Sequence, residues 1–151
     1  MKLAEALQLR AELQNKSDSL HKRICDNLKV PQGESPLEDP GELLRELLAV
    51  NDRLAGLIAG VNKRNNLATL PDGRPLAQAL VQRDAIMKKR KLLSSIADSA
   101  FAREIRVARI VDVKMTVMLS MRDLHAQIDD LSRQFRELDN AIQSVNWSTE
   151  L

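Results

Sequence analysis

Hydrophobic residues recur along this chain every three or four positions, which is the spacing of one face of an α-helix. The pattern continues without a break over six positions between residues 43 and 61, and over eight positions between residues 121 and 145. It predicts helices over about residues 3–29, 41–65, 75–109 and 120–145. We therefore expect an all-α fold, in which long antiparallel helices form a helical bundle or coiled coil.

The last predicted helix has the strongest pattern. Charged residues flank its hydrophobic stripe on both sides, and the stripe continues over more than three heptads. So narrow a stripe is typical of a coiled-coil seam, whereas a monomeric four-helix bundle usually carries a wider apolar face. We predict that this stripe is the seam of an oligomer, formed by Met121, Leu124, Ile128, Leu131, Phe135, Leu138, Ile142 and Val145.

Three segments interrupt the helical pattern. Residues 31–41 carry three prolines and two glycines, which predicts an extended acidic linker over about residues 30–40. Asn65 and Asn66, followed by Pro71-Asp72-Gly73, predict a turn. Hydrophobic and polar residues alternate over 111–119, which predicts a short extended segment or strand, although the same residues could continue a helix.

The composition favours helix packing and an intracellular protein. Aromatic residues make up only 2% of the 151 residues, so aliphatic side chains must fill the core of what we expect to be a single helical domain. The one cysteine, Cys25, rules out an internal disulfide. An acid at Glu5 and a base at Arg10 come too early for a signal-peptide core, and no apolar stretch is long enough to span a membrane. We expect a cytoplasmic location.

Charge is distributed unevenly along the chain, although the net charge is only +2. Residues 74–114 contain ten basic and four acidic residues, whereas residues 31–46 contain one arginine and five acidic residues. A basic and an acidic stretch in one chain are compatible with contacts between copies in an assembly, and equally with binding to an outside partner. The basic run Lys88-Lys89-Arg90-Lys91 points around the whole circumference of a helix, so it gives no single face that follows a phosphate backbone. Nucleic-acid binding through this helix is therefore a less favoured alternative.

Polar residues gather around the turn between the second and third predicted helices. Amides, carboxylates and guanidiniums in one place could bind a small anion or a sugar-like ligand. The alternative is structural, because helix ends and turns need such groups in any case. The candidate ligand-binding residues are Asn62, Asn65, Asp72, Arg74, Arg83 and Asp84.

Two pairs of metal-ligand residue types stand four positions apart, which places each pair on one helix face. The pairs are His21 with Cys25 and His125 with Asp129. If the first and fourth helices are neighbours, the four side chains could approach a tetrahedral metal site, although solvated helix flanks also explain them. We find no phosphate-binding loop, nucleophile elbow or metal-binding His-Glu helix, so the sequence predicts neither a cofactor nor an enzyme.

Several short stretches together resemble the septicolysin-like family of small bacterial helical proteins, whose members have no established function. The resemblance covers nearly the whole chain and is most specific from Asp72-Gly73-Arg74 to Arg83-Asp84 and at the end of the chain. The family label suggests a cytolysin, but this sequence has no membrane-inserting apolar segment. The matching stretches are residues 1–7, 61–65, 72–74, 79–84, 136–139, 142–143 and 146–151.

These patterns together favour a homo-oligomeric helical protein that acts as an interaction or structural module. The long, narrow seams motivate this interpretation, because a chain of 151 residues is too short to cover them all. Ligand binding at the polar turn and nucleic-acid binding through the third helix are the alternatives.

Overall fold

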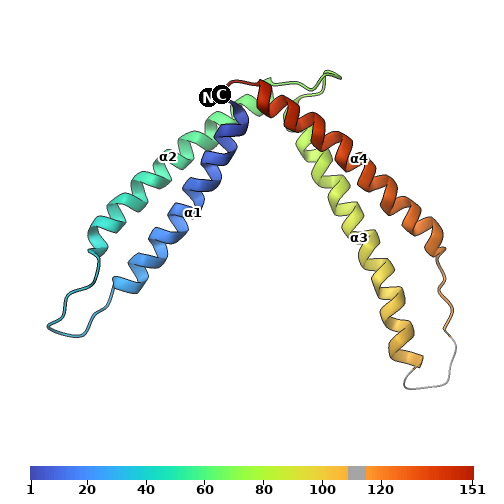
Figure 1. Ribbon diagram of the computed structural model, residues 1–151, viewed down its shortest axis with the longest axis horizontal. Coiled ribbons are helices and arrows are strands. Elements are labelled where there is room, and N and C mark those ends of the chain that lie inside the picture. Colours follow the sequence, from blue (N-terminus) through green and yellow to red (C-terminus); the bar gives the residue numbers. More distant parts are fainter. Residues whose placement is uncertain (109–114) are drawn as a thin grey trace. The chain divides into compact units, whose positions relative to one another are not determined.

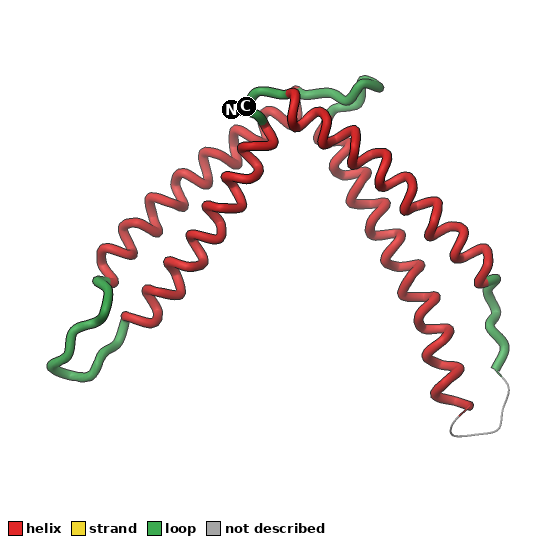
Figure 2. The backbone as a smooth tube through the Cα atoms, viewed as in Figure 1, coloured by secondary structure: helices red, strands yellow, loops and turns green. Residues whose placement is uncertain are grey.

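The computed structural model describes residues 1–108 and 115–151, and the side chains of residues 1–100 and 115–151. Four long helices account for most of these residues: α1 (Leu3–Asn27), α2 (Pro40–Leu67), α3 (Leu76–Ala108) and α4 (Met121–Ser148) (Figures 1 and 2). The all-α prediction is confirmed. The described part of the expected extended segment, residues 115–119, contains neither helix nor strand, and residues 111–114 lie outside the described residues.

Local sequence signals fix where these helices begin and end. Asp39 caps α2, because its carboxylate accepts a hydrogen bond from the Gly41 amide at 2.8 Å, and Pro40 occupies the first helical position. The Ser120 hydroxyl likewise accepts a hydrogen bond from the Asp123 amide at 3.2 Å, at the start of α4. Three of the helix ends lie two or three residues from their predicted positions, and four lie within one residue; the predicted end of the third helix at residue 109 lies outside the described residues.

The chain divides into two compact units. One consists of Met1–Thr69 together with Ser144–Leu151, and the other of Leu70–Gln143. Helix α4 contributes to both units, so the expectation of a single helical domain stays a prediction.

Helices α1 and α2 form an antiparallel hairpin in the first unit (Figure 1). Its core consists of Leu13 and Leu20 of α1 packed with Leu43 and Val50 of α2. These residues are seven apart on each helix, which is the repeat of a two-helix seam. Ion pairs and amide contacts border the seam, including Lys16 Nζ to Glu46 Oε1 at 2.7 Å. The regular heptad spacing therefore produces a hairpin with a single line of core residues.

The loop between α1 and α2 is held at one end by polar contacts. The Arg23 guanidinium pairs with the Glu38 carboxylate, and this pairing lowers the pKa of Glu38 from its usual value. The Glu38 amide also donates to Asn27 Oδ1 at 3.1 Å. Beside these contacts, the side chain of Leu37 is 99% exposed. The predicted acidic linker is thus an ordered connection over part of its length.

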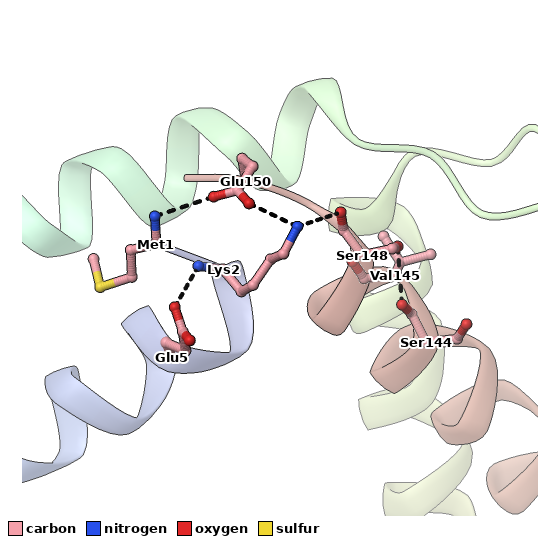
Figure 3. Close-up of polar contacts among 7 residues, drawn as sticks. All are labelled: Met1, Lys2, Glu5, Ser144, Val145, Ser148 and Glu150. Carbon is pink, nitrogen blue, oxygen red and sulfur yellow. Dashed lines mark hydrogen bonds and ion pairs between the residues drawn. The ribbon is translucent and has the colours of Figure 1, made fainter.

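The two ends of the chain meet in the first unit (Figure 3). The Leu3 amide donates to the Thr149 carbonyl and the Leu151 amide donates to the Met1 carbonyl, both at 2.9 Å. The Lys2 ammonium lies 2.6 Å from the Glu150 carboxylate, and this contact lowers the pKa of Glu150 from its usual value. We call this arrangement the terminal clasp. It joins segments almost 150 residues apart in the sequence, which no local pattern could predict.

Helices α3 and α4 run antiparallel in the second unit (Figure 1). Arg83 of α3 lies 3.2 Å from Asp139 of α4, which ties the two helices together near the start of α3. Leu76 and Ala79 of α3 are fully buried. The second unit is therefore also built around a two-helix hairpin.

Candidate functional site

The turn before α3 is built around Asp72 and Arg74. Gly73 takes a positive φ of 86°, a backbone conformation that side chains with a Cβ rarely adopt. The turn closes because the Gly73 amide donates to the Leu70 carbonyl at 2.9 Å and the Leu70 amide donates to the Arg74 carbonyl at 2.8 Å. Asp72 Oδ1 accepts a further hydrogen bond from the Arg74 amide at 3.0 Å. The turn therefore fixes both charged side chains.

Arg74 bridges this turn to the first turns of α3. Its Nε lies 2.8 Å from Asp72 Oδ2, and one of its terminal nitrogens donates to the Gln82 side-chain oxygen. The guanidinium lowers the pKa of the Asp72 carboxyl from its usual value, mainly through this side-chain hydrogen bonding. The pair is charge-balanced and partly exposed to solvent.

Arg83 and Asp84 form a second ion pair, on α3. Arg83 contacts Asp84 at 3.1 Å and Asp139 at 3.2 Å, so its charge is already matched by two carboxylates. Asn62 is exposed and Asn65 half-buried in α2, which belongs to the other unit. Within the second unit, the structure brings Asp72 together with Arg74, and Arg83 together with Asp84. Their role in ligand binding stays a prediction.

Asp72 and Arg74 line an open cavity of about 430 Å³ between the turn, α3 and α4. The cavity also includes Gln82 of α3 and Gln134 and Glu137 of α4, which the sequence reasoning missed. The heptad spacing of both helices indicated that they pack, but not which residues of α4 would lie opposite Gln82. A volume of this size is within the range of small-ligand sites.

Two further cavities lie along the same pair of helices. One, of about 390 Å³, is lined by residues that include Lys89, Leu93 and Asp130. The other, of about 460 Å³, is lined by residues that include Ile96 of α3 and Met118 in the loop before α4. The second unit therefore has openings along much of the described length of its hairpin.

The predicted oligomer seam of α4 is partly covered within the chain. Four of its residues are buried and four are half-buried. The described residues of the chain therefore bury half of these positions and leave the other half partly accessible. The buried residues are Leu124, Leu138, Ile142 and Val145, and the half-buried residues are Met121, Ile128, Leu131 and Phe135.

The candidate metal ligands divide between the two units. His21 Nε2 lies 3.9 Å from Cys25 Sγ on α1, where both residues are exposed, whereas His125 and Asp129 lie on α4 in the second unit. Among the residues that the structure describes, no group of three or more His, Cys, Asp or Glu side chains is arranged to hold a metal ion. A metal site at these positions stays a prediction.

The basic run of α3 is mostly exposed. Lys88, Lys89 and Lys91 are exposed and Arg90 is half-buried.

No helix among residues 1–108 and 115–151 is long and apolar enough to cross a bilayer.

Comparisons with known proteins identify relatives but no activity. Residues 10–151 match the model of a family of unknown function, DUF6847. A crystal structure described as a functionally unknown conserved protein from Corynebacterium diphtheriae is similar, with a TM-score of 0.94 and 37% sequence identity. The similarity covers 100% of this chain and 98% of that chain. No curated protein matches. Because the family match covers nearly the whole sequence, this chain belongs to the family of unknown function DUF6847.

Proposed function

We propose that this protein is an interaction module that works as a homo-oligomer, in which apolar faces left open by its hairpins are buried between copies. Large aliphatic residues exposed on the described parts of its helices carry the proposal.

These residues stay exposed because of the two-helix construction. A two-helix hairpin buries one stripe of each helix, so apolar residues beside that stripe stay at the surface. On α2, Leu44 and Leu48 are exposed beside the buried core residue Leu43. On α3, Leu92 and Ile96 are exposed. Repeated exposure of large aliphatic residues on helices is typical of a surface that is covered in an assembly.

Size-exclusion chromatography with light scattering tests this proposal. We expect a particle that contains two or more copies of the 16.9 kDa chain. A monomer at all concentrations would overturn the proposal. Absorbance at 260 and 280 nm is recorded together with refractive index. Because the chain has one Trp and no Tyr, bound nucleic acid would dominate its absorbance and would favour the basic run of α3 as the functional surface.

The cavity at Asp72 and Arg74 supports a second candidate function, the binding of a small ligand. Arg74 and Gln82 present hydrogen-bond donors at its wall, and Gln134 and Glu137 face it from α4. Thermal unfolding in the presence of inorganic phosphate or of simple sugars tests this candidate. A ligand that raises the midpoint of the wild type, but not that of Arg74→Ala, would support it. Equal shifts in both proteins, or no shift in either, would oppose it.

The septicolysin-like resemblance and the expected cytoplasmic location are compatible with an interaction module. They name no partner or activity.

A further inference from the structure

The three cavities of the second unit follow a seven-residue repeat. Gln82, Lys89 and Ile96 of α3 each line a different cavity. Seven residues are close to two helical turns, so these three side chains lie on the same face of α3. The cavities are therefore parts of one groove, which runs along one face of the α3–α4 hairpin for about 21 Å between Gln82 and Ile96.

The floor of the groove is apolar along its whole length. Ile86, Leu93 and Ala100 of α3 also follow the seven-residue repeat, with one of them in each cavity, and all three are half-buried. Leu131 and Leu138 of α4 line the first two cavities from the other side. Two rows of aliphatic residues at heptad spacing, of which Leu138 is buried and the others are half-buried, form the surface onto which further helices pack in a bundle.

The two helices that border the groove carry opposite net charge. Residues 76–100 of α3 contain five basic and two acidic side chains, whereas residues 121–143 of α4 contain three basic and five acidic side chains. Lys89 and Asp130 line the middle cavity from opposite sides. A surface of complementary charge therefore needs an acidic helix packed against α3 and a basic helix packed against α4. The α3–α4 hairpin of a second copy supplies both helices.

We propose that this groove is closed by the same groove of a second copy, related by a twofold axis parallel to the hairpin, to give a four-helix interface. This inference rests on the proposed function and identifies the surface that the oligomer uses. A twofold axis in this direction places α3 of each copy over α4 of the other. A twofold axis across the hairpin would instead place α3 of each copy over α3 of the other, and like-charge repulsion between these two basic helices disfavours that arrangement.

The twofold axis also determines which charges meet. Rotation about an axis parallel to the hairpin does not change the level of a residue along it. Lys89 and Asp130 line the same cavity, so they lie at the same level. Lys89 of each copy therefore faces Asp130 of the partner subunit, and this contact occurs twice in the dimer.

Charge reversal on each side of the middle cavity tests the arrangement, with Lys89→Glu and Asp130→Lys made as separate variants of the full chain. Each variant alone places like charges together at both contacts, so we expect its dissociation constant to rise at least about tenfold. An equal mixture of the two variants should recover association, because Glu at position 89 of one chain then meets Lys at position 130 of the other. Recovery on mixing requires a contact between chains, and a contact within one chain cannot produce it.

Lys91→Glu is the matched control, because it makes the same charge change on the same helix at an exposed residue that lines none of the three cavities. Its dissociation constant should equal that of the wild type. The groove interface would be overturned if the wild type is oligomeric but neither Lys89→Glu nor Asp130→Lys weakens its association. It would also be overturned if both variants are weakened but do not recover on mixing. Either outcome would leave the proposed function standing. A monomeric wild type would overturn both.

Discussion

Replacement of Gly56 by alanine should stabilise the first unit. Gly56 lies in the interior of α2, and a Cβ added there would meet nothing within 4 Å. Alanine is more favourable than glycine inside a helix by about 0.8–1.0 kcal/mol, because glycine loses more backbone entropy on folding. With no steric cost to subtract, we expect the free energy of unfolding to rise by about 1 kcal/mol.

Gly73→Ala is the matched control. A Cβ at Gly73 would also meet nothing within 4 Å, but its φ of 86° places the residue in the left-handed region. The same substitution should therefore cost about 1–2 kcal/mol there. Opposite signs at two equally open positions would separate the effect of backbone conformation from that of side-chain space.

Urea unfolding followed by circular dichroism measures both variants. A gain of about 1 kcal/mol corresponds to a rise in the urea midpoint of roughly 0.3–1 M. Trp147 belongs to the same unit as Gly56, so its fluorescence reports on that unit. The mass of each variant is measured in parallel, to separate folding from association. A lower midpoint for Gly56→Ala at unchanged mass would refute the reasoning.

Three further predictions concern buried and charged side chains. Leu20→Ala should lower the free energy of unfolding by about 2–5 kcal/mol because Leu20 is fully buried in the α1–α2 core, whereas Leu37→Ala, at a 99% exposed position, should leave the urea midpoint unchanged. The lowered pKa of Glu150 means that its contribution is present above the ordinary glutamate pKa and is lost as the pH falls through the folded-state pKa. Glu150→Gln should therefore reduce the fall in urea midpoint between about pH 6 and about pH 3, and an unchanged pH profile would argue against the terminal clasp. Arg83→Gln should lower the free energy of unfolding by less than about 1 kcal/mol, because its pairs with Asp84 and Asp139 are partly solvated; a larger loss by thermal unfolding would indicate that this tether holds the hairpin together.

The helices could be predicted from the sequence because their causes are local. Heptad spacing, the Asp39–Pro40 start of α2 and the Ser120 cap of α4 all act within a few residues. The Asp72–Arg74 pair could also be predicted from the sequence, because its members are two residues apart on a turn that contains glycine.

The rest of the candidate site depends on how two distant helices align. Gln82 and Gln134 share a cavity only because of the register between α3 and α4, which the spacing within either helix does not specify. The pairing of Arg83 with Asp139 depends on the same register. The heptad spacing of α4 predicts which residues share one helix face, but not that Leu138 would be buried while Phe135 stays half-buried.

The terminal clasp has a consequence for the order in which the protein forms during synthesis. Helices α1 and α2 leave the ribosome first and can pair early, since their contacts are close in sequence. The carbonyl of Thr149, which accepts the hydrogen bond of the Leu3 amide, is made only after α3 and the whole of α4. The segment around Leu3 thus waits for the segment around Thr149, and the first unit is completed only after the second has been translated.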